Sequence, residues 1–184
     1  MTLLVEDGSI VSGAESYVDA ATATTYHANN GNTAWAAATT PAMEAALRKA
    51  ARYMDGKYRS RFLGFRVRPV GTVALPGQAM EWPRLYVPVF GAAPGISPGT
   101  AYANYLPANQ IPQRLKDAQC ELALRALASD LATDGDVSIK RKKLDVIEKE
   151  YAANMVPGQI AYPVVDQLLS DYLKPMGSQD VLRG

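Results

Sequence analysis

The clearest hydrophobic pattern in the chain lies between residues 111 and 133. At 100° per residue, most of its charged side chains fall on one narrow stripe of a helix, whereas leucines, alanines and Cys120 cover much of the remaining circumference. Pro112 suits the first helical position, where its missing N–H would have had no partner. The pattern predicts a helix over about 112–133. Its wide apolar arc requires neighbours on several sides, so this should be the central helix of a bundle.

Three further segments show helical patterns. Asp19 suits the N-cap of a short helix over residues 20–29. A Thr-Thr-Pro start predicts an amphipathic helix from about residue 40 to Tyr58. A last amphipathic helix opens at a Tyr-Pro pair, residues 162–163, and ends before Pro175.

Residues 59–111 break the helical pattern. Prolines and glycines recur through their second half, at a density that forbids both a helix and a central strand. From Leu85 to Gln113 there is no charged residue, and apolar and tyrosine residues are frequent, unlike the composition of a disordered chain. We therefore expect a long extended insertion that packs along a surface, such as that of a neighbouring molecule.

The segment after the central helix alternates apolar and charged residues, which predicts a minor β element over about 137–151. Residues 175–184 have the character of a C-terminal tail. The predicted fold class is therefore mainly α, a small helical bundle around the central helix (about 112–133), with the extended insertion (about 59–111). A length of 184 residues fits one domain, residues 1–184.

Composition narrows the classes of protein to which the chain can belong. Its one cysteine, Cys120, rules out an internal disulfide and any zinc site built from several cysteines. Cys120 lies on the apolar arc and is expected to be a small core residue. No apolar run reaches the length of a membrane span, and the acidic N-terminus lacks the basic start of a signal peptide. We expect a protein made in the cytoplasm, with no membrane partner.

Charge is distributed unevenly along the chain. The net charge is +1, but residues 1–47 carry acids and no Lys or Arg, residues 48–116 are strongly basic, and residues 117–184 are again acidic. A molecule with separate acidic and basic faces can associate with copies of itself head to tail. Ordinary solvated faces would give the same distribution, so this alternative stays open.

No catalytic constellation is visible in the sequence. His27 is the only histidine, has no histidine partner for a metal, and is expected at the surface. Gly91, Gly95 and Gly99 are not followed by the Gly-Lys-Ser/Thr of a phosphate-binding loop. We therefore predict that the chain is not an enzyme and has no catalytic residue, metal site or cofactor.

Two basic stretches have the composition of a nucleic-acid or protein contact. Residues 57–68 interleave cations with Tyr58, Phe62 and Phe65, a pattern suited to phosphate contact and base stacking. Residues 140–143 form a compact basic run. A contact with DNA, a contact with protein and a plain solvated surface all remain open for both. The residues expected to face a partner or DNA, taken from these stretches and from the uncharged segment, are Arg59, Arg61, Arg66, Arg68, Lys140, Arg141, Lys142, Lys143, Tyr102 and Tyr105.

A series of motifs from about residue 14 to 173 resembles a known family. The chain is similar to the small head–tail connector (adaptor) proteins of long-tailed bacteriophages, some of whose relatives are labelled primosomal DnaT-like single-stranded-DNA-binding proteins. The motifs that carry the resemblance are SYVDAATATTYHANNGNTAW, YMDGKYR, AMEWPR, IPQRLKDAQCELALRAL, IKRKKLDVIEKEYA and AYPVVDQLLSDYL.

The resemblance implies a structural adaptor in the neck of the virion. Its copies would form a homo-oligomeric ring, a dodecamer, that joins the portal protein to the next neck component, a stopper or tail terminator. Double-stranded DNA would pass through its lumen. The C-terminal end would engage the portal, which adds Lys174, Leu182 and Arg183 to the candidate residues. The alternative function is that of a single-stranded-DNA-binding module of the primosomal kind, motivated by the two basic stretches.

Overall fold

The computed structural model describes residues 2–67, 77–89, 105–132 and 161–175, together with the backbone of two short strands at 141–144 and 147–150. The chain is mainly helical, with two small antiparallel sheets of two strands each, which confirms the predicted fold class. The elements are α1 (Ala20–Asn29), α2 (Thr33–Ala36), α3 (Thr40–Tyr58), β1 (Phe65–Arg66), β2 (Arg84–Leu85), α4 (Gln113–Ala128), β3 (Arg141–Leu144), β4 (Ile147–Glu150), α5 (Pro163–Leu169) and the 3-10 helix η1 (Ser170–Tyr172).

Helix α4 is the centre of the bundle, as its apolar arc predicts. It packs against α3, α5, α1 and α2, and Leu115, Leu122 and Cys120 are buried in these contacts. The helix ends at Ala128 rather than near residue 133, because Ser129 adopts an extended conformation. Leu131 nevertheless reaches the core beyond the helix end. The apolar pattern therefore continued past the helix without requiring helical backbone.

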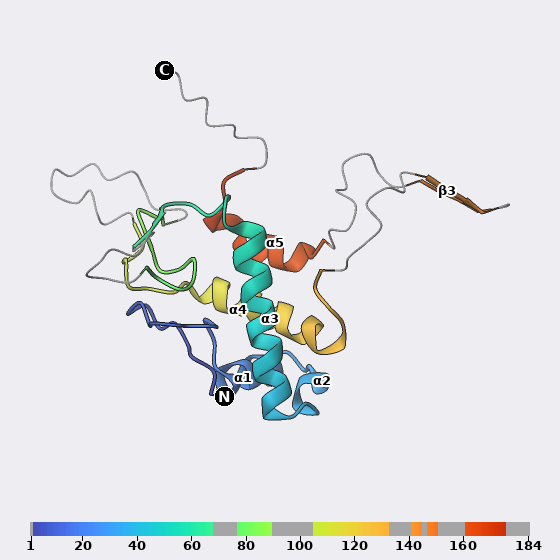
Figure 1. Ribbon diagram of the computed structural model, residues 1–184, viewed down its shortest axis with the longest axis horizontal. Coiled ribbons are helices and arrows are strands. Elements are labelled where there is room, and N and C mark those ends of the chain that lie inside the picture. The colour runs from blue at the N-terminus through green and yellow to red at the C-terminus, as the bar shows by residue number, and fades with distance from the viewer. Residues whose placement is uncertain are drawn as a thin grey trace, which may run out of the picture.

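Helices α3 and α4 cross at the middle of the molecule (Figure 1), with α1 and α2 near the N-terminal end of α3 and α5 near its C-terminal end. The predicted bounds of α1 and α3 are confirmed, and the Asp19 carboxylate accepts a hydrogen bond from the Thr22 N–H at 2.7 Å. The predicted last helix is split into α5 and η1. Among the described residues, no helix is both long and apolar enough to cross a membrane.

The prediction of a surface histidine is wrong. His27 is fully buried, with the Trp35 ring 4.6 Å away and the Tyr26 ring 5.2 Å away between ring centroids. Its Nδ1 lies 3.1 Å from the amide nitrogen of Asn32. Burial lowers the pKa of His27 below its ordinary value. The ring is part of the packing between α1 and α2, which the sequence pattern around one isolated histidine does not reveal.

Two buried polar residues organise the N-terminal segment. Glu6 is buried, and its carboxylate accepts hydrogen bonds from the backbone N–H groups of Gly8, Ile10 and Val11, each at 2.9 Å. The Glu6 carboxylate thus accepts the hydrogen bonds of three backbone N–H groups in the turns that surround it. Gly8 has φ +109°, and a Cβ there would lie 1.9 Å from the carbonyl oxygen of Asn109, so this turn requires glycine.

The second polar residue, Gln119 of α4, joins three segments of the chain. Its side-chain oxygen accepts from the Tyr17 N–H at 2.9 Å, and its amide nitrogen donates to Ser16 Oγ at 2.7 Å and to the Leu47 carbonyl at 3.0 Å. Gln119 is fully buried, so these bonds replace all the contacts that water would have made. The N-terminal segment, α3 and α4 are therefore fixed to one another by one side chain.

The described parts of the predicted insertion contribute to the core. Phe62, Met80, Trp82, Val87 and Ile111 are all buried. The β1–β2 pair joins the two sides of the insertion, with Phe65 opposite Leu85 and Arg66 opposite Arg84. Where it is described, this segment packs on its own molecule, whereas residues 90–104 lie outside the described residues.

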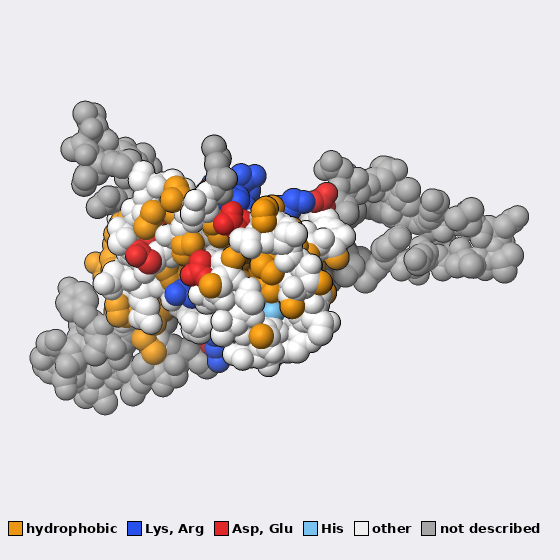
Figure 2. Space-filling view, turned by 90° about the horizontal axis from the view of Figure 1, so that it is seen from below, with side chains coloured by type: hydrophobic (Ala, Val, Ile, Leu, Met, Phe, Trp, Pro, Cys, Tyr) orange, Lys and Arg blue, Asp and Glu red, His pale blue; other side chains and the backbone are white. Residues whose placement is uncertain are grey.

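The predicted minor β element is present as the β3–β4 hairpin, which Figure 1 shows apart from the helical body. Its register pairs Arg141 with Glu150, Lys143 with Glu148 and Lys142 with Lys149. The basic run 140–143 is thus matched by acids at two of its positions. Figure 2 shows charged side chains of both signs in small groups among apolar ones on one face of the molecule, rather than one continuous basic surface.

Candidate nucleic-acid interface

The basic stretch after α3 gathers around one buried acid, Glu81. Glu81 Oε1 lies 2.8 Å from Arg59 Nε and 3.9 Å from Arg66 Nη1, and its Oε2 lies 3.1 Å from Arg84 Nη1. The side chain of Glu81 is 3% exposed. One carboxylate therefore holds three guanidinium groups. Two of them, those of Arg59 and Arg66, are distant from Glu81 in the sequence. We call Arg59, Arg66, Arg84 and Glu81 the arginine cluster.

Arg84 is the structural member of the cluster. It is buried, and it donates to the carbonyls of Leu63 at 2.8 Å and Gly64 at 2.9 Å. Burial lowers its pKa below the ordinary value, and the Glu81 carboxylate opposes that shift. Arg84 was not among the residues expected to face a partner, and its contacts show that it holds the loop before β1 in place.

Arg59 is the member that faces solvent. Its side chain is 70% exposed although Nε is held by Glu81, and no described residue accepts a hydrogen bond from its two terminal nitrogens. Arg66 is 22% exposed, and it donates to the Gln78 carbonyl oxygen. Arg59 is therefore a cation held in a fixed position and directed outward, as phosphate contact requires.

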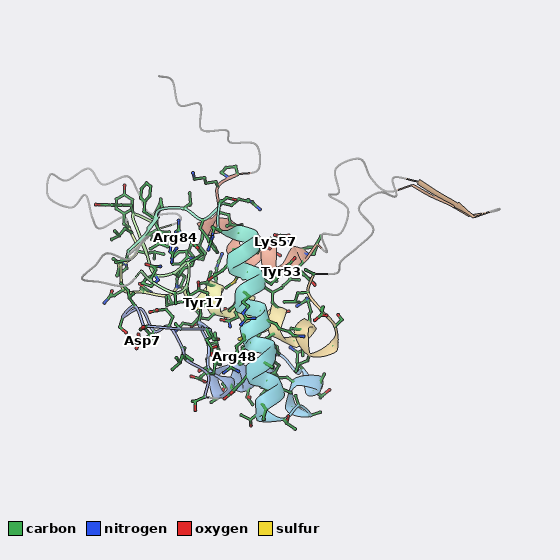
Figure 3. All side chains as sticks on the ribbon, in the orientation of Figure 1. Asp7, Tyr17, Arg48, Tyr53, Lys57 and Arg84 are labelled. Carbon is green, nitrogen blue, oxygen red and sulfur yellow. The ribbon has the colours of Figure 1, made fainter. Side chains whose placement is uncertain are left out.

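Arg61 and Lys174, predicted separately, lie together. The Lys174 N–H donates to the Arg61 carbonyl at 2.7 Å, and Arg61 Nη2 lies 3.4 Å from the Lys174 carbonyl oxygen. The cation of Lys57 lies against aromatic rings. Its Nζ is 5.2 to 5.7 Å from the ring centres of Tyr53, Tyr58 and Tyr162. Figure 3 shows Lys57 and Tyr53 side by side near the C-terminal end of α3.

The aromatic residues predicted to stack on bases are placed differently from one another. Tyr58 and Phe62 are buried in the core, because helix α3 and the turn after it direct both rings inward, so base stacking, which was one of the open possibilities for this stretch, is excluded for these two rings. Phe65 is 69% exposed, on strand β1. Only Phe65 of these three rings is accessible to a ligand.

Two tyrosines from the uncharged segment are also exposed. Tyr86 follows β2 and is 53% exposed, and Tyr105 is 39% exposed. Their ring centres lie 5.9 Å apart at an interplanar angle of 87°. A bridge between Pro88 and Tyr105 and a 2.8 Å bond from the Leu106 N–H to the Val87 carbonyl hold the two segments together. Tyr105 was among the predicted candidates, whereas Tyr86 was missed.

A chain of hydrogen bonds connects the backbone at Glu81 and Trp82 to the side chains of Tyr17 and Asp55. The Trp82 N–H donates to the Tyr17 hydroxyl oxygen at 3.2 Å, and that hydroxyl donates to Asp55 at 2.8 Å. The Glu81 N–H also donates to Asp55, at 3.1 Å. Burial raises the pKa of Asp55 to about 6, although both hydrogen bonds oppose the shift. Figure 3 shows Tyr17 and Arg84 on the same side of α3.

The shifted pKa of Asp55 predicts an unusual pH dependence of stability. The folded-state pKa of about 6 lies above the ordinary 3.8, so the folded protein binds this proton more tightly than the unfolded chain does. Asp55 should therefore raise the free energy of unfolding as the pH falls from about 6 to about 4, by roughly 2 kcal/mol after allowance for partial exposure. Urea unfolding of the wild-type protein and of Asp55→Asn across this range measures the difference.

His27 acts in the opposite direction, because a lowered pKa removes stability as the pH falls through its ordinary range. Its contribution is common to both proteins and cancels in their difference. Equal pH dependence of the wild-type protein and Asp55→Asn would show that Asp55 titrates as an ordinary carboxyl.

The chain matches a known family along its whole length. Residues 1–184 match the family described as "Putative DnaT-like ssDNA binding protein". The chain belongs to this family. No curated protein and no solved structure matches the chain.

The family match corrects the function predicted first. The resemblance to phage head–tail connectors led to a structural adaptor, but the family that covers the whole chain is described by single-stranded-DNA binding. The match supports the alternative drawn from the basic stretches. The ring, its partners and a place in the virion remain untested predictions of the resemblance. The absence of enzymatic activity, predicted from the sequence, is also untested.

Several predicted site residues cannot be placed at the interface. Arg68, Tyr102, Lys140, Leu182 and Arg183 lie outside the described residues. Arg141, Lys142 and Lys143 are described only as backbone of β3. Within the described part of the chain, no group of three or more His, Cys, Asp or Glu residues could hold a metal ion.

Proposed function

We propose that the protein binds single-stranded DNA. The observation that carries the proposal is the match to a DnaT-like single-stranded-DNA-binding family over residues 1–184. Because the match spans the whole chain, the proposal applies to the fold as described and not to one appended segment.

The arginine cluster supports this function through its geometry. A single strand is held mainly by contacts to its phosphates, and each neutralised phosphate releases condensed counterions. Arg59 meets the requirement, because Glu81 fixes its Nε while its side chain stays 70% exposed. Arg61 and Lys174 are two further basic residues that lie together on adjoining segments through contacts with each other's backbone carbonyls. The basic balance of residues 48–116 supplies the wider attraction for an anionic strand.

The proposal predicts a specific change in salt dependence for Arg59→Gln. Binding of a labelled oligothymidylate, followed by fluorescence anisotropy, should weaken steeply with salt for the wild-type protein. Removing one phosphate contact should reduce the slope of log K against log[salt] by about 0.7 and lower affinity at low salt. Since Arg59 is an exposed residue, the variant should fold normally.

Lys49→Gln is the matched control. Like Arg59, Lys49 is an exposed cation; it lies on α3, is 55% exposed and pairs with Asp130. It lies at the middle of the helix, ten residues before Arg59, so its replacement should leave the slope unchanged. Identical slopes for the wild-type protein and Arg59→Gln would exclude Arg59 as a phosphate contact, and an absence of binding by the wild-type protein would contradict the proposed function.

A further inference from the structure

We infer that Phe65, Tyr86 and Tyr105 form a platform on which unpaired bases stack. This inference rests on the proposed function and deepens it, since it assigns the base-contacting residues that complement the phosphate-contacting arginine. We call these three residues the aromatic platform.

The fold brings the platform together from three segments. Phe65 lies on β1 and pairs with Leu85, the residue directly before Tyr86. Tyr105 comes from the far end of the uncharged segment and is joined to this region by its bridge to Pro88. Backbone pairing therefore brings together residues that are separated by up to 40 positions in the sequence.

All three rings of the platform are exposed to solvent. The exposed fractions are 69% for Phe65, 53% for Tyr86 and 39% for Tyr105, and the adjacent Val89 is 38% exposed. Most other large aromatic residues that the structure describes are buried or partly buried in the core. A group of exposed apolar side chains marks a binding surface more often than a lone exposed residue does.

The geometry of the tyrosine pair leaves ring surface available. Tyr86 and Tyr105 meet edge to face, at 87°. In such a pair, one ring presents an edge and keeps both of its faces clear of its partner. A flat base can stack on an open ring face, and base–aromatic stacking is the usual sequence-tolerant contact in single-strand binding.

Tyr86 also has a backbone conformation that its side chain disfavours. Its φ is +57°, in the left-handed region that glycine adopts freely and a bulky residue adopts at a cost. Local folding alone would be satisfied better by glycine at this position. The presence of tyrosine therefore indicates a use for the exposed ring, consistent with the occurrence of such strain at binding sites.

Cations adjoin the platform in the same strand pair. Arg66 follows Phe65 directly on β1 and pairs with Arg84, and both arginines contact Glu81 together with the exposed Arg59. Phe65 thus belongs to the strand pair whose two arginines share Glu81 with Arg59, the exposed cation of the cluster. Such a surface favours a single strand over a duplex, because the faces of paired bases are already covered by their neighbours in the stack.

Tyr86→Gly tests the platform without endangering the fold. Glycine removes the ring and relieves the positive φ, so thermal stability should be unchanged or higher. Affinity for oligothymidylate should fall about 10-fold, as expected for the loss of one stacked base. The salt slope should stay at the wild-type value, since no phosphate contact is lost. Tyr86→Phe, which keeps the ring, should retain wild-type affinity.

Val164→Ala is the control, because Val164 is 46% exposed on α5 and lies outside the platform. It should not alter affinity. Wild-type affinity in both Tyr86→Gly and Phe65→Ala would overturn the platform while leaving the proposed function intact, and would point to a protein partner for these rings. A wild-type protein without affinity for single strands would overturn both.

Discussion

Replacement of Glu81 by leucine should lower the free energy of unfolding by about 3–5 kcal/mol, because it leaves the buried guanidinium of Arg84 without its counter-charge. Arg84 Nη1 lies 3.1 Å from the Glu81 carboxylate, and both side chains are less than 10% exposed, at 8% and 3%. A buried cation that loses its counter-charge keeps its desolvation penalty, which the remaining hydrogen bonds to neutral carbonyls offset only in part. Urea unfolding followed by tryptophan fluorescence measures the loss.

The double variant Glu81→Leu/Arg84→Met separates the pair from its surroundings. With both charges removed, the protein should be more stable than Glu81→Leu alone, since no uncompensated charge remains buried. If the double variant is less stable than the single one, then the carbonyl contacts of Arg84 outweigh its pairing with Glu81.

Replacement of Gln119 by leucine should cost about 3 kcal/mol of stability. Leucine fits a buried site on α4, but it cannot accept from the Tyr17 N–H or donate to the Leu47 carbonyl. Each buried polar group that loses its partner costs about 1–3 kcal/mol. The change also removes the acceptor of the Tyr17 N–H and leaves the Tyr17 hydroxyl bond to Asp55 to hold this residue. The N-terminal segment should therefore loosen, and hydrogen exchange of the Tyr17 amide should speed up.

Gln113→Leu is the comparison on the same helix. Gln113 is exposed and bonds only to Asp117 among the described residues, so its replacement should change stability by about 0.5 kcal/mol or less. Equal stability of the two variants would mean that the hydrogen bonds of Gln119 contribute little.

The parts of the fold that the sequence predicts are those decided by neighbours in the chain. Helices α1 and α3 begin where Asp19 and the Thr-Thr-Pro start place them, and α4 occupies the centre that its apolar arc requires. Capping and the 3.6-residue period are local properties, so they can be recognised in the sequence. The end of α4 cannot be recognised in this way, because Leu131 is buried by tertiary contact after the helix has ended.

The parts that the sequence does not predict depend on distant partners. The buried polar residues His27, Glu6 and Gln119 resemble surface residues by type, and only their contacts show why burial is tolerated. The same holds for aromatic residues, since Phe62 is buried whereas Tyr86 is exposed. Outside regular helices and strands, the type of an aromatic residue does not indicate whether its ring is buried or exposed.

The motifs that suggested a phage adaptor hold the fold together. Tyr17, Asp55, Trp82 and Gln119 belong to separate motifs in the sequence, yet they form connected hydrogen bonds in the structure. Such a series specifies an architecture, and one architecture can carry different functions. This explains why a resemblance carried by these motifs led to a function that the family match corrects.

The central claim is that this fold presents rings and fixed cations to unpaired DNA, and a competition experiment tests it most directly. Wild-type protein bound to labelled oligothymidylate is titrated with unlabelled single strands or with duplex of the same length at one salt concentration. Stacking on exposed bases predicts that the single strand competes at least about 10-fold better than the duplex. Equal competition by the two, or no binding of the labelled strand at all, would contradict the account.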